Sequence, residues 1–256
     1  FYPTSGGQLN DHGFVVSKDG KTRQEVVDVF KQGTNIVLKL RENARFNVGE
    51  QVMQEVDSTR RKQLAQHHTA THIINAAAKR VLGNHINQAG AKKNVDKAHI
   101  DITHYESLTD EEVKKIEGEA NKIVQEDIKL HLRFEDRDVA EKKFGMNIYQ
   151  GGVVPGKHLR IVEIPEVDVE ACGGTHLHST KEVGTIKIIK STKIQDGIVR
   201  LVFVAGEAAE VATTSTGGIL ETLANELDCT QKQIPGRAAE LFVLWKNVIK
   251  KKKEMP

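Results

Sequence analysis

The sequence predicts an α+β fold in three parts: a small β-barrel-like segment over residues 1–57, an α/β domain over residues 58–206, and a helical tail over residues 207–256. Short runs in which apolar and polar residues alternate indicate strands, and turn residues separate these runs. Two longer stretches between the runs repeat their apolar residues with helical spacing. The end of the chain keeps a helical pattern and gives the tail.

The first part contains four expected strands. Their sequences are GFVV, EVVDVF, NIVLKL and QVMQEV, and Gly, Asp or Asn residues bound them at a spacing of roughly ten residues. This regular succession of strands and turns predicts a β-meander or part of a barrel.

A helix is expected from Ser58 to Gly83. Ser58 can serve as its N-cap, and Gly83 stands where a glycine commonly ends a helix. At roughly 100° per residue, His68 and His72 fall together on one flank, one turn apart. The face that we expect to be buried comprises Ala70, Ile74, Ala77, Ala78 and Val81.

Further strands and a second helix follow. A loop rich in Asn, Gly and Lys leads into the strand HIDITHY, and Thr109 with Glu112 forms a capping box that opens the second helix. Asp196 and Gly197 form a turn between the last two strands of this part. The remaining expected strands are LHLRF, HLRIVEI, GTIKIIKST and GIVRLVFVAG.

The pattern from Glu207 onward is helical. Residues 231–235 read as a connection between two helices, and the lysine run at the end reads as a solvated helix terminus.

The composition is that of an ordinary globular protein, with 38% hydrophobic and 28% charged residues and a net charge of +2. The near-balance of charge argues against a protein that coats a polyanion. No run approaches the roughly 18 apolar residues of a membrane span. Only two cysteines occur, which favours a reducing, cytoplasmic location. The start, FYPTSGGQ, lacks both an initiator Met and a signal-peptide pattern, so we expect a piece of a longer protein.

Two short motifs indicate a metal site. HTATH places His68 and His72 four residues apart on one helix, and ACGGTH places Cys172 four residues before His176. One thiolate and three imidazoles suit Zn²⁺, which such ligands hold tetrahedrally. Gly173 and Gly174 allow the sharp turn that brings Cys172 and His176 to one point.

Each motif alone is more often incidental than functional, but their joint occurrence in a cysteine-poor chain favours a metal. A metalloprotease is disfavoured, because its helix needs a Glu directly after the first His, and Thr69 stands there.

Five separated motifs together resemble the editing region of alanyl-tRNA synthetase, most closely the archaeal type. They are FYPTSGGQ, HTATH, HINQAG, YQGGVVPG and EACGGTHLHSTKEVG, in that order. The resemblance covers residues 1 to about 206, and the tail from Glu207 resembles more loosely the start of the C-terminal dimer-forming region.

The resemblance implies hydrolysis of tRNA(Ala) mischarged with serine or glycine, with the tRNA acceptor end as the partner. It also implies that His68, His72, Cys172 and His176 bind Zn²⁺. No aminoacylation domain is recognisable, so we do not expect this chain to charge tRNA.

Three further roles are implied by the resemblance. Gln88 would orient water or substrate beside the metal, Thr4 would bond the serine hydroxyl, and Gly6, Gly7 and Gln8 would shape the loop near the substrate. From the residues alone, Gln88 is an ordinary surface amide and Thr4 an ordinary loop hydroxyl. Lys92, Lys93 and the C-terminal lysines are candidate phosphate contacts.

Two alternatives stay open at this point. The zinc site can be structural, in a non-catalytic module that docks tRNA or dimerises. The chain can also be a free-standing trans-editing factor, because such factors and the editing domain of threonyl-tRNA synthetase share the His and Cys motifs.

Overall fold

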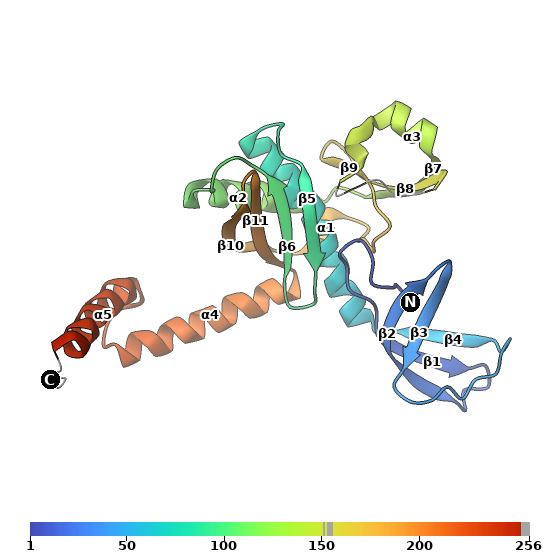
Figure 1. The fold of residues 1–256 in the computed structure, drawn as a ribbon, viewed down its shortest axis with the longest axis horizontal. Helices are drawn as coiled ribbons and strands as arrows, with labels where there is room; N and C mark the ends of the chain where they lie inside the picture. Colours follow the sequence, from blue (N-terminus) through green and yellow to red (C-terminus); the bar gives the residue numbers. More distant parts are fainter. Residues whose placement is uncertain (151, 153–155, 252–256) are drawn as a thin grey trace. The chain divides into compact units, whose positions relative to one another are not determined.

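The computed structural model describes residues 1–150, 152 and 156–251, and it divides into two compact units, Phe1–Ala209 and Glu210–Pro256. The first unit contains three antiparallel sheets and three α-helices, which confirms the predicted mixture of helices and strands (Figure 1). In the part of the chain that the structure describes, no helix has the length and apolar character needed to cross a membrane.

The N-terminal sheet contains the four predicted strands. All neighbours pair antiparallel, in the order β3-β2-β1-β4, so β3 and β4 form the two edges. Val15, Val26 and Val29 form its small buried core. The strands are β1 (Gly13–Ser17), β2 (Arg23–Gln32), β3 (Asn35–Leu40) and β4 (Val52–Val56).

The central sheet has the order β10-β11-β6-β5, and helices α1 (Ser58–Leu82) and α2 (Asp110–Gln125) pack against it (Figure 1). The expected loop rich in Asn, Gly and Lys is partly wrong, because it contains β5. Pairing with β6 across a bulge stabilises this glycine-containing edge strand, which has no strand-like alternation. The strands are β5 (Gln88–Lys93), β6 (Ala98–Thr103), β10 (Ile186–Gln195) and β11 (Ile198–Ala205).

Helix α1 is buried more completely than its pattern predicts. Every residue from Gln63 to Ala78 is buried, so the expected division into a buried face and a separate histidine flank is wrong. The helix has sheets and loops on several sides, and its polar side chains find partners there. Its N-cap is Asp57, which accepts a hydrogen bond from the backbone of Arg60, and not Ser58 as expected. Gly83 does end the helix, with a positive φ of 116°.

The third sheet comprises β7 (His131–Asp136), β8 (His158–Ile164) and β9 (Asp168–Ala171), with helix α3 (Arg137–Phe144) packed on it. The pattern predicted β7 and β8 but neither α3 nor β9. The capping box of Thr109 and Glu112 at the start of α2 is confirmed. Strand β9 contacts α1, and the loop after it carries the ACGGTH motif.

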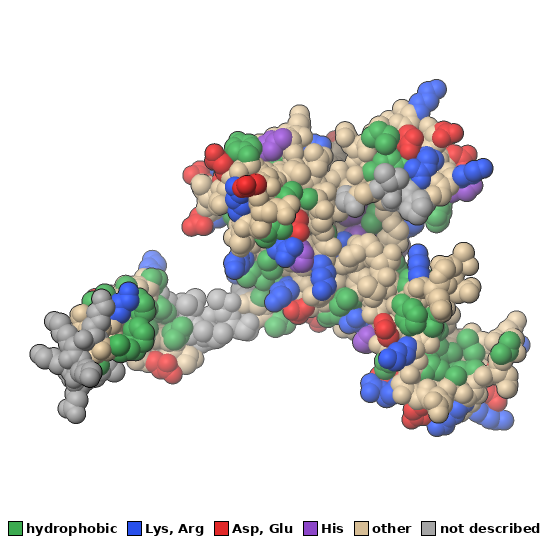
Figure 2. Space-filling view, in the orientation of Figure 1, with side chains coloured by type: hydrophobic (Ala, Val, Ile, Leu, Met, Phe, Trp, Pro, Cys, Tyr) green, Lys and Arg blue, Asp and Glu red, His purple; other side chains and the backbone are tan. Residues whose placement is uncertain are grey.

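Helix α4 (Glu207–Glu226) leads from the first unit into the second, which contains α5 (Ile234–Lys251). A short 3₁₀ turn, Gln231–Gln233, joins the two helices where the connection is expected. Helix α5 exposes six large apolar side chains, and Figure 2 shows hydrophobic side chains gathered on this part of the chain. They are Leu241, Phe242, Val243, Leu244, Trp245 and Ile249.

Candidate metal centre

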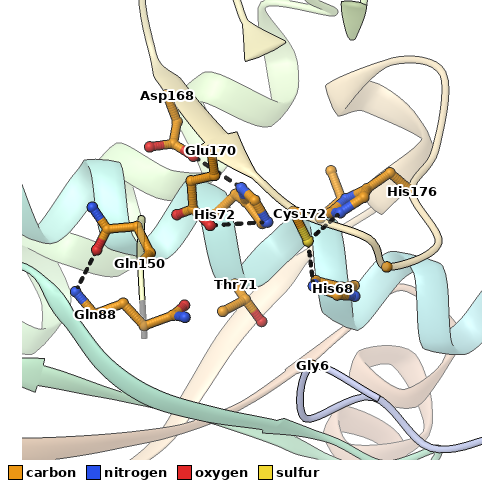
Figure 3. Close-up of polar contacts among 12 residues, drawn as sticks. Gly6, His68, Thr71, His72, Gln88, Gln150, Asp168, Glu170, Cys172 and His176 are labelled. Atoms are coloured by element: carbon orange, nitrogen blue, oxygen red, sulfur yellow. Dashed lines mark hydrogen bonds and ion pairs between the residues drawn. The ribbon is translucent and has the colours of Figure 1, made fainter. Parts of the chain in front are cut away.

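Helix α1 and the loop after β9 bring the four predicted ligands together (Figure 3). The Sγ of Cys172 lies 3.3 Å from the Nε2 of His68 and 3.4 Å from the Nε2 of His176. The ring centroid of His72 lies 4.7 Å from that of His176 and 5.7 Å from that of His68. One ligand atom from each residue lies within 4.8 Å of all the others. We call these four residues the metal cluster.

The three imidazoles are oriented from outside the cluster. In each ring the Nδ1 atom has a partner away from the centre, which leaves Nε2 to face the thiol. Metal-binding histidines in proteins are fixed in this manner, because the outer hydrogen bond selects the tautomer and the ring orientation. The three pairs are His68 with the Oε1 of Gln8 at 2.7 Å, His72 with the Oδ2 of Asp168 at 2.9 Å, and His176 with the Oγ1 of Thr69 at 3.2 Å.

The charges within the cluster also suit a metal. Burial raises the pKa of the Cys172 thiol, but His68 and His176 outweigh burial and hold that pKa well below its ordinary value. Burial lowers the pKa of His176 to about 4 and that of His68 well below its ordinary value. A thiolate beside the two neutral imidazoles of His68 and His176 is a protonation state that suits Zn²⁺ binding.

Gln8 joins the two halves of the centre. This side chain is fully buried, and its Oε1 pairs with His68 while also accepting a hydrogen bond of 3.0 Å from the backbone N–H of Thr175. Its Nε2 donates to the Oγ1 of Thr175 at 2.8 Å. The N-terminal loop therefore holds both α1 and the loop after β9 in register. The family resemblance implies that Gln8 shapes the loop near the substrate, and it does not anticipate the contact with His68.

Two carboxylates at the centre were missed by the sequence analysis. Asp168 and Glu170 lie on β9, and alternate residues of a strand project to one face, so they reach the same side as Cys172. Burial lowers the pKa of His72, but Glu170 and Asp168 outweigh it and raise that pKa well above its ordinary value. Burial also raises the pKa of Glu170 well above its usual range. The alternation in DVEAC was the available signal.

The loop after β9 approaches α1 so closely that it requires glycine. A Cβ atom on Gly174 would lie 1.9 Å from the Cε1 of His68, whereas one on Gly173 would meet nothing within 4 Å. Arg160 on β8 donates from Nη1 to the carbonyls of Cys172 and Gly174, both at 2.8 Å. Arg160 thus holds the loop at Cys172 and at Gly174, the residue that lies closest to His68.

Gln88 lies at the start of β5, on the side of the cluster where Glu170 also lies in Figure 3. Its backbone N–H donates to the Oε1 of Gln150 at 2.9 Å. Gln150 belongs to the YQGGVVPG motif, of which residues 151 and 153–155 lie outside the described residues. The structure thus brings the HINQAG motif and the start of the YQGGVVPG motif into contact.

Thr4 is exposed in the N-terminal loop, and its hydroxyl is engaged locally. Its Oγ1 accepts a hydrogen bond of 3.1 Å from the backbone of Asn10 and lies 3.3 Å from the Asn10 Oδ1. The backbone N–H of Thr4 donates to the carbonyl of Val29 at 3.0 Å. These contacts hold Thr4 against the N-terminal sheet.

Lys93 is not the surface phosphate contact that its sequence neighbourhood suggests. Its side chain is only 2% exposed, and its Nζ donates to the carbonyl of Gly6 at 2.9 Å. The backbone N–H of Lys93 also donates to the carbonyl of Gly7 at 2.7 Å, so Lys93 anchors the N-terminal loop. Lys92 is exposed, in keeping with its expected role. The side chains of the C-terminal lysines, residues 250–253, lie outside the described part of the chain.

Two cavities flank the metal cluster. One has a volume of about 530 Å³ and is lined by the basic residues Arg61, Lys62 and Arg160 as well as by His176. The other has a volume of about 430 Å³, and its lining includes Gln150 and Asp168. The first cavity thus reaches the cluster at His176, whereas the second reaches Asp168, the partner of the His72 Nδ1.

Comparison with known proteins relates the chain to aminoacyl-tRNA synthetases. Residues 159–202 match the family model described as the threonyl and alanyl tRNA synthetase second additional domain. The chain is 43% identical over 246 residues to an alanine–tRNA ligase of Methanothermobacter thermautotrophicus, a match that covers 96% of this chain and 27% of the relative.

Two further alanine–tRNA ligases extend the comparison. The enzyme of Staphylothermus marinus is 46% identical over 248 residues, covering 97% of this chain and 26% of the relative. The enzyme of Natronomonas pharaonis is 44% identical over 255 residues, covering 100% of this chain and 27% of the relative. The chain thus spans about a quarter of the length of these relatives. With similarity of this level along essentially its whole length, the chain belongs to the alanyl-tRNA synthetase family.

Proposed function

We propose that this chain is an editing hydrolase that cleaves the ester of Ser-tRNA(Ala) and Gly-tRNA(Ala), with Zn²⁺ held by the metal cluster. The observation that carries the proposal is the convergence of three Nε2 atoms on one Sγ, with every Nδ1 bonded outward. A pocket built for the methyl group of alanine cannot strongly exclude glycine or serine, so a second hydrolytic site is needed to remove errors.

A zinc ion at the cluster would supply Lewis-acid polarisation of the ester carbonyl or a more acidic water. The chain itself supplies position: Gln8, Asp168 and Thr69 fix the ligand rings, and the cavities beside the cluster give the acceptor end room to enter. Lys62 and Arg160 in one of these cavities are suited to a phosphate of the tRNA terminus.

The remaining parts have proposed roles as well. Residues 1–57 would support the editing domain of residues 58–206, and residues 207–256 would begin a region that forms a homodimer. The exposed apolar side chains of α5 favour such a contact. We place this activity in the cytoplasm, a reducing compartment that suits a chain with only two cysteines.

A structural zinc site in a non-catalytic tRNA-docking or dimerisation module is the second candidate. Four protein ligands are typical of closed, structural sites, and this observation favours it. A free-standing trans-editing factor would share the proposed chemistry and differ only in the protein that carries it.

Deacylation of Ser-tRNA(Ala) by the chain, with and without a chelator, tests the proposal. We expect hydrolysis that stops on zinc removal while the far-ultraviolet circular dichroism is retained. Loss of the folded signal together with zinc, in a protein that never hydrolyses the ester, would favour the structural candidate.

Replacing Gln88 by alanine tests its proposed role beside the metal. An amide can donate and accept, so Gln88 can hold a water or the substrate in line with the ester carbonyl. We expect Gln88→Ala to slow single-turnover deacylation by roughly ten- to a hundredfold while zinc stays bound. A wild-type rate in a zinc-replete variant would reject the role, and zinc loss would make Gln88 a structural support of the cluster.

Thr4→Val tests the proposed reading of the serine hydroxyl. A hydrogen bond is worth about 0.5–1.5 kcal/mol net, so the preference for serine over alanine esters should fall by up to about tenfold. Thr4→Ser keeps a hydroxyl for both Asn10 and the substrate and should keep the preference. An unchanged ratio in Thr4→Val would show that Thr4 only holds its loop.

A further inference from the structure

Glu170 has a buried carboxyl group, and one of its two oxygens has no hydrogen-bond partner among the described residues. Its side chain is 5% exposed, and its Oε1 is buried without a hydrogen-bond partner among the described residues. Burying an unpaired carboxyl oxygen costs free energy, and native structures contain few such groups. An exception at the edge of a proposed active site points to a ligand that supplies the missing donor.

The other carboxyl oxygen of Glu170, Oε2, shows where this side chain lies relative to the metal cluster. Oε2 is 3.4 Å from the Nε2 of His72, the nitrogen that faces the metal cluster, while Asp168 occupies the opposite nitrogen of the same ring. Glu170 therefore lies immediately beside the cluster. In Figure 3 its side chain lies on the same side of His72 as Gln88 and Gln150.

The chain supplies no permanent counter-cation to this carboxyl. Apart from His72, no ion pair within 4.0 Å joins Glu170 to a basic side chain of the described residues. Lys93 acts on it only from a distance, since its ammonium is bonded to the carbonyl of Gly6. A cationic donor that enters with the substrate would fill this place.

We propose that Glu170 binds the α-ammonium group of the aminoacyl ester. The inference rests on the proposed function and adds a substrate class: esters of α-amino acids whose amino group is free. An ammonium would donate to Oε1 and stabilise the ionised form of the carboxyl, whereas an N-acylated amino group offers a single neutral donor and a bulky substituent. The site would therefore reject peptidyl-tRNA and other N-blocked esters.

Binding of stable amide analogues tests this. The probes are 3′-(L-seryl)amino-3′-deoxyadenosine and its N-acetyl derivative, titrated calorimetrically into the zinc-loaded full chain. A charge-assisted hydrogen bond predicts that the free-amine probe binds about ten- to a hundredfold more tightly than the acetylated one. Glu170→Gln, which keeps the shape without the charge, should lose most of this preference, and Glu170→Met should abolish it.

Glu163→Gln is the matched control, because it removes the same charge from the neighbouring strand at a carboxyl that Arg133 already holds. It should keep the preference. Zinc content is measured in every variant, and zinc loss from Glu170→Gln would assign the carboxyl to the metal and overturn the proposal.

The comparison of the two probes on the wild-type chain does not depend on whether any variant folds. If the wild-type chain binds both probes equally, the ammonium assignment is wrong while the proposed function stands. If it binds neither probe and does not hydrolyse Ser-tRNA(Ala), the proposed function fails and the assignment fails with it.

Discussion

Cys172→Ala is expected to abolish zinc binding and to slow deacylation of Ser-tRNA(Ala) by about a thousandfold or more. The thiolate is the one anionic donor of the metal cluster, and its Sγ lies within 3.4 Å of two ligand imidazoles. A catalytic metal contributes several kcal/mol to a reaction of this kind, and about 4 kcal/mol corresponds to a thousandfold change in rate. His72→Ala should give the same result by removing an imidazole from the cluster.

Metal analysis and single-turnover kinetics measure both effects, with near one equivalent of zinc expected in the parent. Cys229→Ala is the control, because Cys229 is the chain's other free cysteine and does not belong to the metal cluster. It should keep both zinc and activity. Unchanged zinc content in both Cys172→Ala and His72→Ala would refute the ligand assignment.

The local patterns predicted most of the secondary structure because each rests on interactions near in sequence. The capping box at Thr109 and the four N-terminal strands lie where the sequence places them. The arrangement within each metal motif was predictable for the same reason, whereas Cys172 and His68, which come together in the structure, are 104 positions apart. Helical spacing sets the relation between His68 and His72, and a short glycine loop sets that between Cys172 and His176.

The contacts around the cluster depend on residues far apart in sequence. Gln8 reaches His68 across 60 positions, and Asp168 reaches His72 across 96. No local period encodes either pairing. Strand β9 was missed because its four residues include two acids, which a surface strand or a loop would equally carry. Only the packing of β9 against α1 turns those acids toward the metal cluster.

Burial of α1 was underestimated for a related reason. His67 is a packing histidine, as its place near the apolar face predicts, because its Nδ1 lies 2.7 Å from the carbonyl of Asn94 and its Nε2 lies 3.2 Å from the Nε2 of Gln63. A polar side chain with such hydrogen-bond partners can be buried at little cost in free energy. Hydrophobic periodicity therefore identifies only one of the buried faces of α1.

Gly174→Ala tests whether the close approach of the loop to α1 holds the metal cluster in place. The added methyl would lie 1.9 Å from the Cε1 and 2.3 Å from the Nδ1 of His68, so the ring or the loop must shift. Arg160 holds the loop and Gln8 holds the ring, which leaves neither free to move without losing a hydrogen bond. We expect zinc affinity to fall by about a hundredfold or more, the upper range for lost support of a metal ligand.

Gly173→Ala is the control one residue away. A Cβ atom there meets nothing within 4 Å, and Gly173 does not have a positive φ, so the substitution adds the same methyl without a clash. Zinc affinity, measured by competition with a chelator, should be near wild type in Gly173→Ala and strongly reduced in Gly174→Ala. Equal affinities in the two variants would mean that the loop can retreat from His68, and that the ligand geometry does not depend on this contact.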